Sequence, residues 1–157
     1  MKPTIGISDG DRQAVARILA TIQADEAVLS AKTRQYHWNV TGPHFSELHR
    51  LFGEQYEAID ETIDEIAERG RALGAVAPGT LAAFLAMTRL QEQQTVPNAQ
   101  AMVTSLLQDH EAIIRQLRAD VESTGATYRD VGTSDFLTGI MEAHEKMAWM
   151  LRSHAEA

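Results

Sequence analysis

Cysteine is absent from this sequence, and its 14 lysine and arginine residues are outnumbered by 22 aspartate and glutamate residues. The absence of cysteine excludes disulfide bonds and thiolate metal sites, so nothing in the composition calls for an oxidising compartment. The formal net charge of −8 opposes binding to nucleic-acid phosphates, which requires lysine and arginine side chains that displace counterions. The same charge favours the attraction of cations.

Long apolar runs are also missing. No stretch approaches the roughly 18 apolar residues of a membrane span, and the first residues, MKPTIGISDGDRQ, lack the apolar segment of a signal peptide. We therefore expect a cytoplasmic protein with no membrane partner. A chain of 157 residues is long enough to bury its own core, and we expect one domain over residues 1–157.

Proline and glycine are sparse and mostly separate segments of helical periodicity. One such segment runs from about residue 9 to 40, and a Thr-Gly-Pro break at 41–43 separates it from a second helix over about 43–73. A short helix is predicted within residues 80–90, followed by long helices over about 98–124 and 134–154. No segment shows the alternation of a strand. This pattern predicts an all-α fold: a ferritin-like four-helix bundle with a short extra helix in the crossover connection between helices two and three.

Candidate metal ligands lie on both sides of the break. His37 precedes it and His49 follows it, while Asp64 and Glu68 share one face of the second helix at i, i+4. Imidazole and carboxylate suit iron and other divalent first-row metals. Fifteen residues at 1.5 Å each, however, place His49 and Asp64 about 22 Å apart along one helix, too far to share an ion. Two copies packed antiparallel about a two-fold axis would unite the two ends, so the motif predicts a dimer with metal at its interface.

The same residues resemble a known family. The run His37-Trp38-Asn39, His49 twelve residues later, residues 64–69 and the closing Ala72-Leu73-Gly74 are similar to the Dps family, the bacterial mini-ferritins, over nearly the whole chain. The resemblance implies a hollow dodecamer that binds Fe(II) between subunits, oxidises it, preferentially with hydrogen peroxide, and stores Fe(III) inside, which protects the cell from oxidative damage. It implies a ferroxidase with iron (Fe2+/Fe3+) at two-fold interfaces, whose catalytic and metal-binding residues are His37, His49, Asp64 and Glu68.

One position departs from the family pattern. Four residues after His49 the family places a carboxylate that completes the ligand set, and this chain has Gly53. The second iron position is then served by Glu57, by Glu54 or by water, or it binds weakly. Glu57 is favoured by direction because it lies one turn beyond Gly53 on nearly the same face. A metal-binding cage with weakened ferroxidase activity is therefore one alternative function.

A nucleoid-binding protein is the other alternative, with the nucleoid as its location. Some members of the family compact DNA through lysine-rich terminal arms. In this chain only Lys2 precedes the first helix, and the final residues, RSHAEA, are nearly neutral. We therefore expect DNA binding to be disfavoured.

The remaining histidines are interpreted as structural or surface residues: His44, His110, His144 and His154. None of the six histidines has an acidic residue three positions before it, which argues against a conventional di-iron site inside one bundle. Trp38 adjoins the predicted site, where core packing and a redox role are both open.

The acidic segment before the last helix also resembles the family. Asp135 is similar to residues that line negatively charged three-fold pores for iron, and Asp130 lies just before it. The alternative for this segment is helix capping, with Thr133 or Ser134 as the N-cap.

Overall fold

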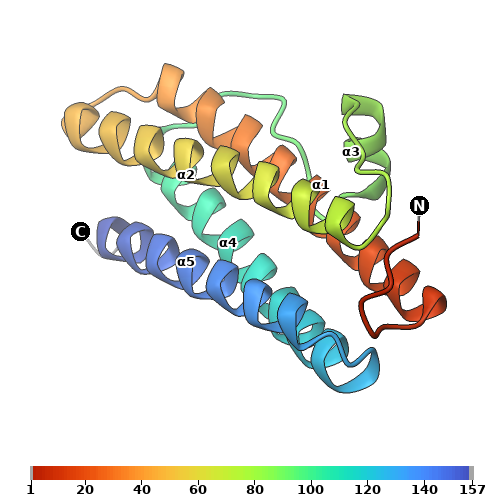
Figure 1. The fold of residues 1–157 in the computed structure, drawn as a ribbon. Helices are drawn as coiled ribbons and strands as arrows, with labels where there is room; N and C mark the ends of the chain where they lie inside the picture. Colours follow the sequence, from red (N-terminus) through yellow and green to blue (C-terminus); the bar gives the residue numbers. More distant parts are fainter. Residues whose placement is uncertain (1, 156–157) are drawn as a thin grey trace.

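The computed structural model describes residues 2–155, which form a bundle of four long helices (Figure 1). These are α1 (Asp9–Asn39), α2 (Phe45–Ala72), α4 (Ala99–Glu122) and α5 (Val131–Ala155). A short helix, α3 (Leu81–Met87), lies in the connection between α2 and α4, and a π-helix, η1 (Ser123–Thr127), follows α4. Residues 2–155 contain no strand, so the predicted all-α class is confirmed.

The long helices pack as two antiparallel hairpins, α1 with α2 and α4 with α5 (Figure 1). After α3, the chain returns along the α1–α2 hairpin before α4 begins, so α2 and α4 run in the same direction (Figure 1). The observed arrangement is the predicted bundle with one crossover connection. The core between the hairpins is mostly apolar; its largest fully buried side chains include Tyr36, Phe52, Leu19, Ile22, Leu29, Ile59, Ile66, Met102, Leu106, Ile113 and Leu117.

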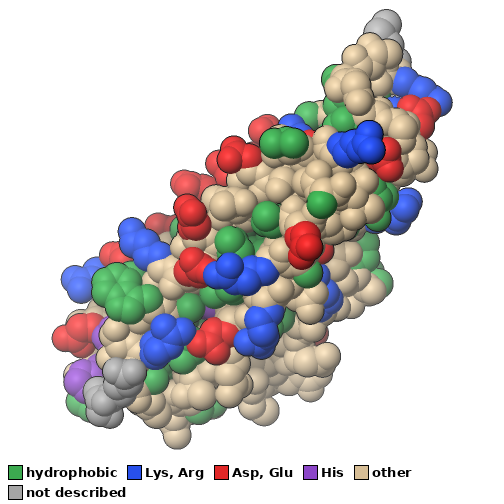
Figure 2. Space-filling view, turned by 90° about the horizontal axis from the view of Figure 1, so that it is seen from below, with side chains coloured by type: hydrophobic (Ala, Val, Ile, Leu, Met, Phe, Trp, Pro, Cys, Tyr) green, Lys and Arg blue, Asp and Glu red, His purple; other side chains and the backbone are tan. Residues whose placement is uncertain are grey.

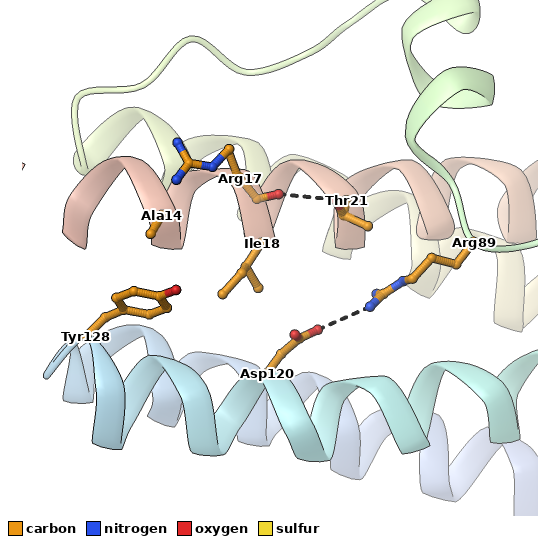
Figure 3. A pocket seen from close by; sticks show the side chains of 7 residues that line it. All are labelled: Ala14, Arg17, Ile18, Thr21, Arg89, Asp120 and Tyr128. Carbon is orange, nitrogen blue, oxygen red and sulfur yellow. Dashed lines mark hydrogen bonds and ion pairs between the residues drawn. The ribbon is translucent and has the colours of Figure 1, made fainter. Parts of the chain in front are cut away.

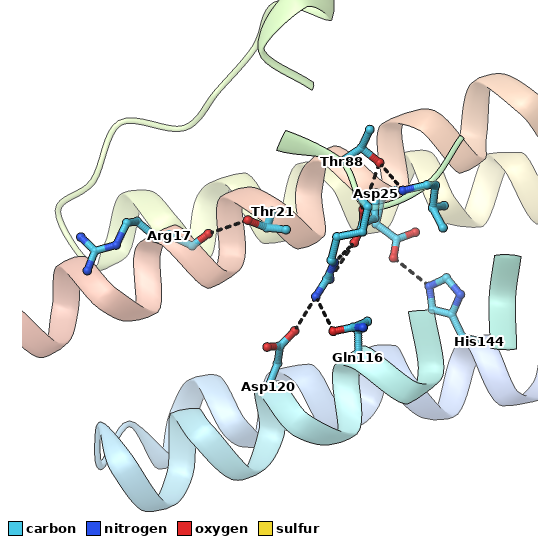
Figure 4. Close-up of polar contacts among 10 residues, drawn as sticks. Arg17, Thr21, Asp25, Thr88, Gln116, Asp120 and His144 are labelled. Atoms are coloured by element: carbon cyan, nitrogen blue, oxygen red, sulfur yellow. Dashed lines mark hydrogen bonds and ion pairs between the residues drawn. The ribbon is translucent and has the colours of Figure 1, made fainter. Parts of the chain in front are cut away.

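A buried carboxylate helps to hold the crossover connection. Asp25, on α1, accepts hydrogen bonds from the Thr88 hydroxyl at 3.0 Å, the Arg89 backbone N–H at 2.6 Å and Arg89 Nε at 2.7 Å (Figure 4). Arg89 also donates to Gln116 at 3.1 Å and Asp120 at 3.4 Å, both on α4. The end of α3 is therefore tied to both hairpins.

Three predicted helix ends differ from the structure. α2 begins at Phe45 rather than Pro43, because Pro43 lies within the turn and His44 is the N-cap. The third long helix, predicted to reach about residue 124, ends at Glu122 and continues into η1, which contains Gly125. α5 begins at Val131 rather than at about residue 134. A Cβ atom at Gly125 would lie 2.9 Å from Ser134 Oγ, so this glycine allows close approach of α5 rather than simply ending a helix.

Acidic and basic side chains lie beside one another on the surface seen in Figure 2, which views the α4–α5 side of the bundle. One ion pair that crosses between these helices joins Arg152 to Glu111 at 2.7 Å, and a second joins Arg118 to Glu145. This face therefore does not present a continuous basic patch. Among the helices of residues 2–155, none has the length and apolar character needed to cross a membrane.

Candidate metal site

His37 and His49 face each other across the α1–α2 hairpin. Their rings stack with centroids 3.8 Å apart and planes inclined by 18°. His37 Nδ1 lies 2.6 Å from the His49 carbonyl oxygen, and His49 Nδ1 lies 2.8 Å from the His37 carbonyl oxygen. Because a carbonyl oxygen only accepts, each Nδ1 carries a proton and donates it. In the neutral ring, the lone pair then resides on Nε2, where it is available to a metal.

Aromatic neighbours restrict both imidazole rings. Phe45 stacks on His49 with centroids 5.2 Å apart, and Tyr56 meets His37 edge-on at 5.3 Å. The Arg34 guanidinium lies 4.7 Å from the centre of the Tyr56 ring. Both histidines are half-buried. We call His37 and His49 together the histidine half-site; its ring orientations are set before any metal binds.

Asp64 and Glu68 form the acidic half-site toward the other end of α2. Both side chains are exposed, and within residues 2–155 neither takes part in an ion pair. Because α2 is one helix from Phe45 to Ala72, the separation of about 22 Å between His49 and Asp64 applies. No group of three or more His, Asp or Glu side chains in the described chain could hold a metal ion. The fold thus unites the two histidines and leaves the acidic half-site apart from them.

Two glutamates near Gly53 are the predicted substitutes for the missing carboxylate, and both lie on the surface of α2. Glu54 lies 3.9 Å from Arg50, and Glu57 is exposed. In the described residues, no hydrogen bond joins either carboxylate to His37 or His49. Gly53 itself is buried against His37.

Trp38 lies next to the histidine half-site in sequence and is 70% exposed. The core-packing interpretation is therefore wrong for this chain, because most of the indole lies outside the bundle. The neighbouring Tyr36 occupies the core instead and donates to the Ser105 hydroxyl at 3.3 Å.

Asp130, rather than Thr133 or Ser134, caps α5. Its carboxylate accepts from the Thr133 backbone N–H at 3.0 Å and from the Thr133 hydroxyl at 2.6 Å. Arg69, on α2, donates to the same carboxylate at 3.0 Å. Asp130 is only 3% exposed, so it serves as an internal clamp and does not fit a pore lining. Asp135 is exposed.

A second histidine cluster, with an acidic partner that sequence patterns did not single out, lies inside the bundle. His144 Nε2, on α5, lies 2.9 Å from Glu26 Oε1 on α1, and His144 Nδ1 lies 2.8 Å from His110 Nδ1 on α4 (Figure 4). Within residues 2–155, Glu26 Oε2 and His110 Nε2 have no hydrogen-bond partner. Burial, with a smaller contribution from the charge of His144, lowers the pKa of His110 well below its usual range. We call these three side chains the core relay; its contacts form a chain rather than converging on one point.

A surface pocket between α1 and the end of α4 lies apart from both half-sites (Figure 3). Its lining includes Ile18 and Thr21 from α1, the ring of Tyr128, and the Arg89–Asp120 ion pair. No histidine lines it, so the pocket is not part of the metal site.

Comparison with known proteins places these features in context. Residues 16–157 match the family model of the ferritin-like domain. An uncharacterised low temperature-induced protein of Nostoc sp. is 49% identical, over 97% of this chain and 86% of that relative. DNA protection during starvation protein 2 of Bacillus anthracis is 37% identical, over 88% of this chain and 94% of that relative. A Dps crystal structure from Vibrio cholerae is 29% identical, with a TM-score of 0.91, over 97% of this chain and 95% of that chain. It is described as a member of a broad superfamily of ferritin-like di-iron-carboxylate proteins.

Proposed function

Because the chain belongs to the Dps family of ferritin-like proteins, we propose that it is a ferroxidase that takes up Fe(II) between two subunits and stores Fe(III) inside a closed shell. Iron storage by mini-ferritins is the general function of this family. The observation that carries the proposal is the separation of the two half-sites on one rigid helix. A chain with half a ligand set at each end of α2 needs a second copy to complete a site.

The complete site combines side chains from two subunits. When two α2 helices pack antiparallel about a two-fold axis, the histidine half-site of one lies opposite the acidic half-site of the other, and symmetry produces the arrangement twice. The Nδ1 hydrogen bonds support this assignment because they direct the metal-binding lone pair of each imidazole to Nε2. The exposure of Asp64 and Glu68 supports it as well, since their oxygens remain free for a partner.

Iron is the substrate at this site. The imidazoles of His37 and His49 bind Fe(II), while the carboxylates of Asp64 and Glu68 offset its charge and stabilise the harder Fe(III) product. Two Fe(II) ions each lose one electron to one hydrogen peroxide molecule, which takes up two protons and leaves as two water molecules. Removing Fe(II) and peroxide together limits the formation of hydroxyl radicals. A shell of twelve subunits encloses the Fe(III) product, and Asp135 lines the entry route for iron.

DNA binding is not proposed for this chain. The relative from Bacillus anthracis carries DNA protection in its name. Twelve copies of a chain with net charge −8, however, have a net charge of about −96, which repels phosphate groups. The mixture of acidic and basic side chains on the α4–α5 face also argues against DNA binding (Figure 2). A gel shift that persists at physiological salt would favour the nucleoid alternative.

Anaerobic mixing of the metal-free protein with Fe(II) and then peroxide tests the proposed function. We expect Fe(III) to form faster than in a protein-free control, with two Fe(II) consumed per peroxide. The variant His37→Ala/His49→Ala should lose most of this rate, whereas His44→Gln, which changes an exposed histidine without a side-chain capping bond, should retain it. A wild-type rate no higher than the protein-free rate would favour the cage with weakened activity.

Light scattering tests the assembly separately. A shell of twelve 17.3 kDa subunits is expected. A monomer that binds iron with full stoichiometry would contradict a shared site, because one chain holds no complete ligand set.

A further inference from the structure

Gly53 lies directly against the ring of His37. A Cβ atom at this position would lie 3.1 Å from His37 Cε1 and 3.2 Å from His37 Nδ1. Carbon atoms in favourable contact are separated by about 3.5–4.0 Å, so even the smallest side chain would push against the imidazole. Glycine is also less favourable than alanine inside a helix, so its presence here has a cost that something must offset.

The ring of His37 has little freedom to move away. Its Nδ1 is held at 2.6 Å by the His49 carbonyl oxygen, one face stacks on the His49 ring at 3.8 Å, and Tyr56 packs edge-on at 5.3 Å. A shift large enough to relieve contact with a Cβ atom would lengthen the hydrogen bond or disturb the stack. Either change would alter the direction in which Nε2 points.

We infer that Gly53 is a positioning residue, whose missing side chain lets His37 keep its Nδ1 bond to His49 and present Nε2 to a divalent first-row metal. The inference rests on the proposed function and deepens it. A missing ligand is therefore only part of what distinguishes Gly53 from the carboxylate of the family pattern. The half-site that results binds metal through imidazole nitrogen alone, a ligand type suited to zinc, cobalt and iron.

Co(II) binding to the assembled protein tests the inference without relying on iron oxidation. Affinity is measured by calorimetry, and the visible absorption of Co(II) reports its ligand geometry. We expect Gly53→Ala to weaken Co(II) binding by about 10- to 100-fold, as expected for loss of a residue that orients a ligand, and to change the spectrum. Gly70→Ala is the matched control, because Gly70 is also buried on α2 but has no atom within 4 Å of an added Cβ.

The His37→Ala background separates positioning from other effects. Removing the imidazole leaves room for a Cβ atom, so Gly53→Ala should cause no further loss of Co(II) affinity there. An equal loss in both backgrounds would overturn the inference, as would wild-type affinity and spectrum in Gly53→Ala alone. If Gly53→Ala fails to assemble, assembly of the double variant would support a clash with His37, whereas failure of both would overturn it.

The same experiment distinguishes this inference from the proposed function. If His37→Ala weakens Co(II) binding and Gly53→Ala does not, the shared site stands and the positioning role is wrong. If His37→Ala leaves both Co(II) binding and Fe(II) oxidation unchanged, the proposed site itself is wrong.

Discussion

Mild acid should destabilise the bundle through His110 in the core relay. The native pKa of His110 lies well below 6.5 because the ring is fully buried, with repulsion from His144 adding to the effect, while the unfolded chain binds a proton near pH 6.5. Below pH 6.5 the unfolded state therefore binds more protons than the native state, and stability falls as the pH falls. Glu26 from α1 and His144 from α5 are the ionisable groups that make up the relay with it.

The upper limit of the effect follows from proton linkage. Each pH unit below 6.5 removes up to about 1.4 kcal/mol per subunit while the native ring stays neutral, so lowering the pH from 8 to 5 should cost at most about 2 kcal/mol. Urea unfolding of wild type and His110→Gln at equal protein concentration measures it. At pH 8 the variant should be less stable because the contact with His144 is disturbed, and this difference should shrink at pH 5, by at most about 2 kcal/mol.

His44→Gln removes an exposed histidine and serves as the matched control, for which the wild-type pH dependence is expected. Identical pH dependence in wild type and His110→Gln would refute the reasoning, since it would mean that His110 binds its proton equally in both states.

Three further perturbations follow from the contacts. Asp25→Asn should loosen the end of α3, because the buried carboxylate that accepts three hydrogen bonds from residues 88–89 loses its charge. Hydrogen exchange in residues 81–90 should accelerate, and unchanged exchange would contradict the proposed role of Asp25 in holding the connection. Asp130→Ala should lower the free energy of unfolding by about 1–2 kcal/mol, more than Ser8→Ala does at the exposed cap of α1. Equal losses for the two variants in urea unfolding would count against the role of Asp130 as an internal clamp. His37→Ala and His49→Ala should each weaken zinc binding in calorimetry yet leave the shell intact by light scattering, because apolar packing provides most of the stability; disassembly would argue for a structural role instead.

The hairpin and the separation of His49 from Asp64 could be predicted because their signals are local. Apolar periodicity and the break at residues 41–43 define α1 and α2, and the rise per residue fixes how far apart His49 and Asp64 lie. The structure retains both features, with α2 starting two residues later than expected. The sequence alone does not predict that His37 and His49 each donate an Nδ1 hydrogen bond to the other's carbonyl oxygen, because these bonds depend on how closely two helices approach.

Long-range pairing explains the features that were missed. Glu26 lies on the apolar stripe of α1 that includes Leu19, Ile22 and Leu29, so its burial could have been suspected, but its partner His144 is 118 residues away. Asp130 is a mixed case: its capping bonds to Thr133 are local, whereas its burial depends on the ion pair with Arg69 of α2. Charged side chains enter a core only with partners, and a single sequence does not identify partners on other helices.

The sharing of each metal site between two subunits is tested most directly by co-assembly. A His37→Ala/His49→Ala protein and an Asp64→Asn/Glu68→Gln protein are refolded separately and as an equal mixture, with mixed shells verified by native mass spectrometry. Each parent should lack most peroxide-driven Fe(II) oxidation. Random pairing makes half of the two-fold interfaces mixed, and each mixed interface contains one complete site, so mixed shells should recover about a quarter of wild-type activity. Verified mixed shells with no activity above the parents would contradict the shared site.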